Sequence, residues 1–303
     1  MGITNFDQVQ ANAFLGPPPQ GNPFGTTYYV STTGSDAGSR DGKSPSNAWL
    51  TIAYAISRSL AGDNFIIAPG TYAEAVLNPL AHQSFRAGLI NSKRPSVVIS
   101  TAVTNGVTVD VDGCQFYGIE FKATAAAVTT LINFASVAIS DGLLFDSCVF
   151  NGADQTTVVG ITNAHATIQG SRLVVRNCLF RNLTGHCISI GAMGNAYGYI
   201  GYNNFSLDVA SGTGINLAST TAFVTSKGYV IEHNTFIGFS ASASEVGITI
   251  AGTENTTGAG IIRNNYFSYC AAAAITIDKL SLSEVNNYYG DAATGGTLVD
   301  PGT

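Results

Sequence analysis

The chain has 303 residues, of which 11% are charged and 45% are hydrophobic, and its formal net charge is −6. An average soluble domain carries roughly 25% charged residues, and disordered chains and coiled coils carry still more, so both classes are excluded. Only 13 residues are Lys or Arg, so we expect no nucleic-acid partner. No run of 18 apolar residues occurs, so we expect no membrane span. What remains is rich in Gly, Thr, Ser, Asn, Ile and Val, a composition typical of β proteins.

The first 25 residues differ from the rest of the chain. They hold no Lys or Arg and four prolines, namely Pro17, Pro18, Pro19 and Pro23. A Pro-rich segment of this kind is typical of an extended arm, and it lacks the basic and apolar regions of a secretory signal. We therefore expect residues 1–25 to attach the protein to a larger assembly, with a floppy terminus as the alternative. Five cysteines, an odd number, argue against a disulfide scaffold and suit assembly in a reducing compartment.

The next fifty residues predict a mixed segment with one helix. Their pattern indicates a strand at 27–31, a polar loop at 32–47, an amphipathic helix at 49–60, a strand at 65–68 and a turn at 69–72. No second helix of comparable strength is predicted after this point. The following strands are short and are separated by clusters of Gly, Asn, Asp and Thr.

A short motif then recurs along the chain. It consists of an apolar residue, two variable residues, Cys or Asn, any residue and an aromatic, and the last copy departs from it by starting with Glu284. Its copies are VDGCQF (111–116), FDSCVF (145–150), VRNCLF (175–180), IGYNNF (200–205), IEHNTF (231–236), IRNNYF (262–267) and EVNNYY (284–289). The closing aromatics lie 22 to 34 residues apart. A second series runs in phase, at Ile161, Ile188, Ile215, Ile248 and Ile275. Such a period without intervening helices predicts a β-solenoid.

Stacked coils explain these two series. Coils stacked at about 4.8 Å place like residues on like. We expect a column inside the coil, made of Cys114, Cys148, Cys178, Asn203, Asn234, Asn265 and Asn287. An Asn at a tight turn bonds the backbone of neighbouring turns, and Cys fills the same place as a small buried hydrophobe. Turn positions with positive φ call for Gly and Asn.

The stretch from 28 to 76 resembles the opening of pectate-lyase-like right-handed parallel β-helix proteins. After the helix it matches the family's Gly-Asp pair and its P-G-x-Y-x-E run, at Gly62, Asp63, Pro69, Gly70, Tyr72 and Glu74. The resemblance implies an all-β, single-stranded right-handed parallel β-helix over 26–303. It further implies an N-terminal cap with a short capping helix at about 26–75, and a closing segment at about 284–303. The fold hosts lyases, hydrolases, adhesins and phage tailspikes, so it leaves the function open.

Charged residues provide the candidate site. Strand alternation places the residue two before the Cys/Asn column on an outer face, and this outer column reads Asp112, Asp146, Arg176, Gly201, Glu232, Arg263 and Val285. Asp146 beside Arg176, and Glu232 beside Arg263, would form a catalytic or sugar-binding strip. The alternative is a solvated ladder of opposite charges, each pair worth a fraction of a kcal/mol.

Calcium is the cofactor that the family's lyases imply, and the loop at 34–42 is the weak candidate site for it. Asp36 and Asp41 are the carboxylates there, and oxygen ligands suit calcium. Asp and Gly also favour turns. The sequence alone otherwise predicts no metal or cofactor.

Three functions are compatible with these observations. The first is a viral structural protein, a capsid-decorating fibre or tailspike-like phage protein. It would be assembled in the host cytoplasm as a homotrimer, bind other virion proteins through residues 1–25 and bind a host-surface polysaccharide. The opening MGITNF resembles the starts of some phage structural proteins. The second is a polysaccharide lyase or glycoside hydrolase, and the third is a non-catalytic glycan-binding adhesin, for which an extracellular location is the alternative.

Overall fold

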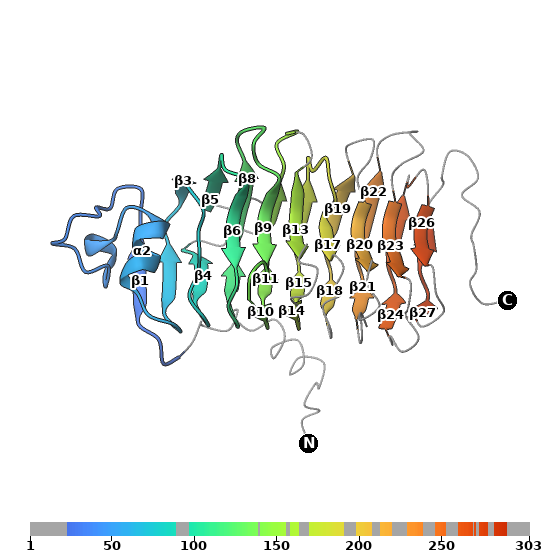
Figure 1. Ribbon diagram of the computed structural model, residues 1–303, viewed down its shortest axis with the longest axis horizontal. Helices are drawn as coiled ribbons and strands as arrows, with labels where there is room; N and C mark the ends of the chain where they lie inside the picture. Colours follow the sequence, from blue (N-terminus) through green and yellow to red (C-terminus); the bar gives the residue numbers. More distant parts are fainter. Residues whose placement is uncertain are drawn as a thin grey trace, which may run out of the picture.

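The fold is an all-β, right-handed parallel β-solenoid, as predicted (Figure 1). The computed structural model describes residues 23–88, 97–138, 140–155, 158–163, 170–190, 198–207, 213–219, 229–238, 246–252, 260–268, 270, 273–277 and 282–289. The arm at 1–25 therefore lies almost wholly outside the described residues, as does most of the closing segment. No helix within the described ranges is long and apolar enough to cross a membrane.

Three parallel sheets run the length of the molecule, and each full coil contributes one strand to each sheet. Sheet A comprises β1 (Thr27–Val30), β2 (Asn64–Ile67), β4 (Ser84–Ala87), β7 (Gln115–Tyr117), β11 (Leu144–Asp146), β15 (Val174–Arg176), β18 (Tyr199–Gly201), β21 (Val230–Glu232), β24 (Gly260–Arg263) and β27 (Leu282–Val285). Sheet B comprises β3 (Gly70–Glu74), β5 (Val97–Thr101), β8 (Ile119–Ala123), β12 (Val149–Asn151), β16 (Leu179–Arg181), β19 (Asn204–Leu207), β22 (Thr235–Gly238), β25 (Tyr266–Ser268) and β28 (Tyr288–Tyr289).

Sheet C completes each coil. It comprises β6 (Asn105–Val109), β9 (Thr130–Phe134), β13 (Val159–Asn163), β17 (Ile188–Ile190), β20 (Thr213–Ser219), β23 (Val246–Gly252) and β26 (Ala273–Ile277). A small two-stranded sheet joins β10 (Ser140–Asp141) to β14 (Gly170–Ser171). Each sheet therefore presents one row of strands to solvent along the molecule.

Identical side chains stack inside the coil. On sheet B the rings of Phe150, Phe180, Phe205, Phe236 and Phe267 stack with centroids 4.6 to 4.8 Å apart. On sheet C the predicted isoleucine series is confirmed, since Ile161, Ile188, Ile215, Ile248 and Ile275 are partners in successive strands. The spacing of the hydrogen-bonded strands sets the ring spacing, so the backbone ladder and the aromatic stacks reinforce each other.

The Cys/Asn column is confirmed from Cys148 onward. The Oδ1 atom of Asn234 accepts from the backbone N–H of Asn203 at 3.0 Å, and its Nδ2 atom donates to the carbonyl of Ile200 at 2.9 Å. Asn203, Asn265 and Asn287 repeat this pattern. Each asparagine therefore satisfies backbone groups at the corner between sheets A and B, which the strand ladder itself cannot reach.

The corner residue just before this column has left-handed backbone in every coil from β7 to β27. These residues are Gly118, Ser147, Asn177, Tyr202, His233, Asn264 and Asn286, with φ between 52° and 67°. Gly and Asn tolerate this region best, which explains why Gly or Asn stands at four of the seven positions. The predicted preference holds at these four positions, whereas Ser147, Tyr202 and His233 adopt the same backbone conformation without being Gly or Asn.

The first copy of the motif is misplaced. Phe116 pairs with Phe145 on sheet A, whereas Phe121 pairs with Phe150 on sheet B. The sequence VDGCQF fits the motif because it ends in Phe116. This residue belongs to a separate phenylalanine stack in the first coils of sheet A. Cys114 therefore does not belong to the column of Cys148 and Cys178, although all three thiols are free and buried.

The predicted helix is present but short. It spans α2 (Ile52–Arg58) rather than 49–60, and a 3-10 turn, η1 (Pro45–Asn47), precedes it. Glu74 of β3 accepts from the backbone N–H of Ile52 at 2.7 Å, and Thr51 is the N-cap. The glutamate of the P-G-x-Y-x-E run thus binds the helix start to sheet B, and burial raises the pKa of this carboxyl. That the helix caps the solenoid stays a prediction.

The asparagine column predicts a large loss of stability when one member is truncated. Asn234→Ala leaves the buried N–H of Asn203 and the carbonyl of Ile200 without their partner, which costs about 3 kcal/mol. Urea unfolding followed by circular dichroism measures this loss. The control is Asn204→Ala, which changes an exposed asparagine whose side chain makes neither of these bonds and should alter the free energy of unfolding by less than about 0.5 kcal/mol. Equal losses in the two variants would contradict the structural role.

Candidate functional site

The predicted strip of charges lies on the outer face of sheet A. Asp146 and Arg176 are partners in neighbouring strands, and their side chains form an ion pair at 2.8 Å. Asn177 and Ser147 also donate to the Asp146 carboxylate, each at 3.0 Å. The carboxylate is only 10% exposed. Asp146 is therefore held by three side chains rather than presented to a substrate.

The second pair has the same construction. Glu232 and Arg263 are partners in neighbouring strands, with Arg263 Nε 2.7 Å from the carboxylate. The Tyr199 hydroxyl donates to the other carboxylate oxygen at 3.0 Å. This ring crosses Gly201, where a Cβ atom would lie 2.4 Å from the hydroxyl. Burial, with the bond to Glu232, raises the pKa of Tyr199, so the phenol stays protonated at neutral pH.

The two pairs are too far apart to work as one catalytic pair. Asp146 and Glu232 are separated by three strand steps, or about 14 Å at the usual strand spacing. Paired carboxyls of glycosidases lie about 5 to 9.5 Å apart. The structure therefore confirms the two predicted neighbour pairs but does not bring the four residues together.

Asp112 does not belong to this column. Tyr117, not Asp112, is the partner of Asp146. Asp112 lies one corner earlier, where its carboxylate accepts from the backbone N–H of Asp141 at 2.8 Å. The displaced first motif copy is the cause, since it shifts the assigned position by five residues.

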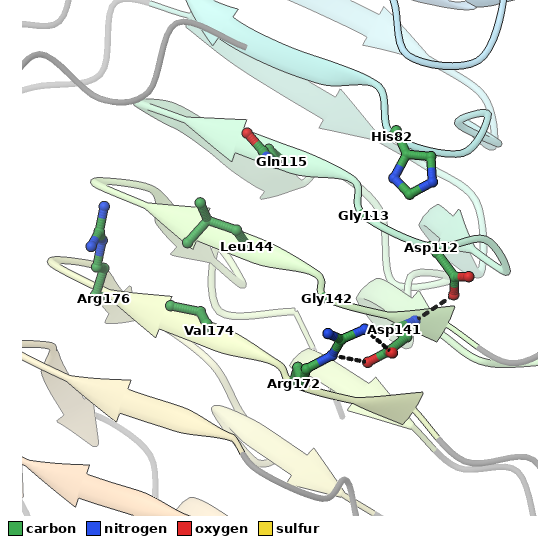
Figure 2. A pocket seen from close by; sticks show the side chains of 10 residues that line it. All are labelled: His82, Asp112, Gly113, Gln115, Asp141, Gly142, Leu144, Arg172, Val174 and Arg176. Carbon is green, nitrogen blue, oxygen red and sulfur yellow. Dashed lines mark hydrogen bonds and ion pairs between the residues drawn. The ribbon is translucent and has the colours of Figure 1, made fainter. Parts of the chain in front are cut away.

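A hollow of about 550 Å³ lies beside the strip, over β7, β11 and β15 in the middle of sheet A (Figure 2). Its floor contains Gln115, Leu144 and Val174, which are partners in adjacent strands. Its rim includes His82, Asp112, Asp141, Arg172 and Arg176. In Figure 2 the Arg172 guanidinium faces Asp141, to which it is bound through two nitrogens. The hydrogen bond from Arg172 holds the pKa of Asp141 below its usual range.

The weak calcium candidates have other partners. Asp36 accepts from the backbone N–H of Leu50 at 2.8 Å and from the Thr51 hydroxyl at 2.7 Å, which fixes the loop before α2. Asp41 accepts from the backbone N–H of Lys43 at 3.1 Å, as in an Asx turn. No group of three His, Cys, Asp or Glu side chains suited to a metal occurs within the described part of the chain.

Sheet C carries an uncharged polar column that the sequence reasoning missed. Successive strands from β6 to β23 place one hydroxyl or amide each in register, namely Thr108, Asn133, Thr162, Ser189, Asn216 and Thr249. On either side of this column lie buried columns, one of them the isoleucine series and the other apolar except at Asn163. Alternation therefore points the polar column outward. The available signal was the polar residue that follows each isoleucine of the series.

His186 lies at the edge of this column. Its Nε2 atom is 3.4 Å from the amide nitrogen of Asn216, and its buried Nδ1 atom has no hydrogen-bond partner. Burial lowers the pKa of His186, so the imidazole is neutral at pH 7. The face of sheet C therefore offers hydroxyl, amide and neutral imidazole groups, which donate and accept hydrogen bonds without bringing charge.

Comparison with solved structures shows the same fold. The pectin methylesterase of Aspergillus niger in deglycosylated form matches with a TM-score of 0.54 and 15% identity, over 88% of this chain and 87% of that chain. A rhamnogalacturonan lyase matches with a TM-score of 0.51 and 13% identity, over 87% of each chain. No family model and no curated protein matches the sequence. At these identities the likeness establishes the parallel β-helix fold and leaves the activity open.

The lowered pKa of His186 predicts an acid-sensitive contribution to stability. Below about pH 6.5 the unfolded chain binds a proton that the folded chain resists, so stability is lost as pH falls. The decrease in Tm from pH 7.5 to pH 5.5 should be smaller in His186→Gln than in the unmodified protein. The control is His233→Asn, an exposed histidine whose neighbours in the corner column are Asn264 and Tyr202. The same decrease in all three proteins would contradict the prediction.

Proposed function

We propose that this protein is a non-catalytic β-helix that binds a polysaccharide along the outer face of sheet C. The observation that carries the proposal is the polar column of that sheet, with one hydroxyl or amide side chain per strand over six strands. Strands repeat at about 4.8 Å, which is close to the length of one sugar ring in an extended chain. Successive sugars would therefore meet the same kind of hydrogen-bonding group at each step.

The charged residues of sheet A support binding rather than catalysis. Asp146 and Glu232 are each bound to an arginine of a neighbouring strand. Asp141 of β10, next to sheet A, is bound to Arg172 of the following coil. A general acid or a nucleophile must reach the substrate, and these carboxylates are directed to their own ladder instead. We therefore assign Asp146, Arg176, Glu232 and Arg263 to stabilising sheet A.

An enzyme is the second candidate, because the solved structures that share the fold carry the names of enzymes. A pectin methylesterase and a rhamnogalacturonan lyase share the fold. In that case the four residues of the strip would act on the bound glycan.

The polar column predicts which substitutions weaken binding. A glycan array that includes pectin, rhamnogalacturonan and bacterial capsular polysaccharides identifies a ligand, and calorimetry measures its affinity. Asn133→Ala with Asn216→Ala removes two hydrogen-bonding groups at about 1 kcal/mol each, so the Kd should rise roughly 30-fold. Asn204→Ala, the same change on the outer face of sheet B, is the matched control and should leave the Kd unchanged.

Two outcomes would contradict this assignment. Equal affinity in the double variant and the control would exclude sheet C as the binding face. Shortening or de-esterification of the bound glycan, abolished by Asp146→Asn or Glu232→Gln, would establish the enzyme instead.

The biological setting comes from the sequence alone. The Pro-rich arm and the opening MGITNF favour a phage fibre or tailspike located in the virion, with the glycan on the host surface. The homotrimer is the oligomer that the sequence predicts, and it is the alternative to a two-fold pair of copies. Residues 1–25 are the segment assigned to other virion proteins.

The arm makes this setting testable. Removal of residues 1–25 should abolish incorporation into particles and leave glycan affinity unchanged, because the arm and the solenoid have separate roles. Mass spectrometry of purified particles, made with the full or the truncated chain, counts the incorporated copies. Equal copy numbers would show that the arm is not the attachment segment.

A further inference from the structure

The outer face of sheet A is complementary to itself when its strand order is reversed. From β11 to β24 the charged column reads Asp146, Arg176, Gly201, Glu232 and Arg263. Read from the other end, every acid falls where a base stood, and Gly201 falls on itself. We propose that two copies of this chain pair through sheet A with antiparallel solenoid axes, about a two-fold axis at β18 that runs along the strands.

The two-fold axis matches opposite charges across the contact. It places Arg263 of the second copy opposite Asp146, and Glu232 of the second copy opposite Arg176. The Asp146–Arg176 pair of one copy then faces the Glu232–Arg263 pair of the other copy, with each acid opposite a base. Because the charges on each copy are already paired at 2.7 to 2.8 Å, the column is neutral as a whole. Such complementarity selects orientation and register more than it adds affinity.

A second column on the same face is apolar between β11 and β24 except for the Tyr199 hydroxyl, and polar residues, Gln115 and Ser283, continue it at its two ends. It reads Leu144, Val174, Tyr199, Val230 and Ile261 in successive strands. The same axis sets Tyr199 against its own copy, Val174 against Val230 and Leu144 against Ile261. An apolar centre with charged groups beside it is the usual anatomy of a protein interface.

The hollow of Figure 2 and one exposed side chain fit each other under this axis. The floor of the hollow includes Leu144 and Val174. At the C-terminal end of sheet A, Ile261 is 37% exposed. The axis places β24 of the second copy over β11, so Ile261 lies over the hollow at Leu144. It places β27 over β7, so Val285, which is 42% exposed, lies over Tyr117 beside the hollow.

A parallel arrangement of copies is less favourable on this face. A two-fold axis along the solenoid would set the charged column of one copy against the apolar column of the other. Asp146 would then face Leu144, and Glu232 would face Val230, each without an opposite charge. Burial of charged groups against apolar ones is costly. For contacts through sheet A we therefore infer the antiparallel pair and not the homotrimer predicted from the sequence.

The size of the face predicts a weak dimer. Seven strands, β7 to β27, take part, which spans about 29 Å along the solenoid and about 10 Å along each strand. This footprint is well below the roughly 800 Å² per partner of a standard interface. We therefore expect a weak pair that forms only at high protein concentration.

Sedimentation velocity over a concentration series tests the proposal on the full chain. The mass should rise from 31.4 kDa to twice that value. Ile261→Glu sets a carboxylate against Leu144 and should raise the dimer Kd at least tenfold. Val137→Glu, a change at a 74% exposed valine outside sheet A, is the control and should leave the Kd unchanged. A monomer at all concentrations, a three-fold mass, or an equal effect of both variants would overturn the proposal.

Crosslinking tests the antiparallel register. Leu144→Cys mixed with Ile261→Cys should form an intermolecular disulfide under a mild oxidant, because the axis brings these two positions together. Either variant alone should not, since Leu144 lies two strand steps, about 10 Å, from the axis and its copy about 19 Å away. All five native cysteines are buried and do not compete. Self-crosslinking as strong as that of the mixture, or none in the mixture, would overturn the register while leaving glycan binding by sheet C unaffected.

Discussion

The parallel register between successive coils is the constraint on which the rest of the structure depends. Each strand must lie in register with the next at about 4.8 Å, so every side chain has the equivalent side chain of the next coil as its nearest neighbour. Phenylalanines stack at 4.6 to 4.8 Å along most of sheet B for this reason. Asn203, Asn234 and Asn265 can each bond the next coil because their partners sit at the same height. In the strip on sheet A the neighbouring coil supplies the opposite charge, as Arg176 does for Asp146.

The sequence predicted the columns that combine a distinctive residue with a fixed neighbour. Asn in the corner column is preceded by a residue with positive φ, and few residue types suit either position. The isoleucine series could also be predicted, because its members recur in phase with the motif of the corner column. The first coil failed for a physical reason: sheets A and B both contain phenylalanine stacks there, so Phe116 satisfied the motif meant for Phe121. The error moved Asp112 into a column that Tyr117 occupies.

The site was predicted in part. Alternation was enough to place Asp146 beside Arg176 and Glu232 beside Arg263, because each pair is set by one register. It could not show that Ser147, Asn177 and Tyr199 complete the coordination of those carboxylates, since these contacts depend on corner geometry and side-chain direction. The polar column of sheet C was missed because Thr, Ser and Asn are abundant throughout the chain. Only their position after each stacked isoleucine distinguishes Ser189 and Asn216 from turn residues.

A surface that repeats with every coil favours partners that repeat as well. On sheet C the outward groups are alike from strand to strand and carry no charge, so a ligand can be recognised once per step and in more than one register, as a polysaccharide allows. On sheet A the outward groups alternate in sign around Gly201, so only one register of a second copy matches every charge. The shortage of charged residues is what separates the two faces: a few paired charges give sheet A a defined register, and their absence from the column on sheet C leaves that face open to a chain of similar units.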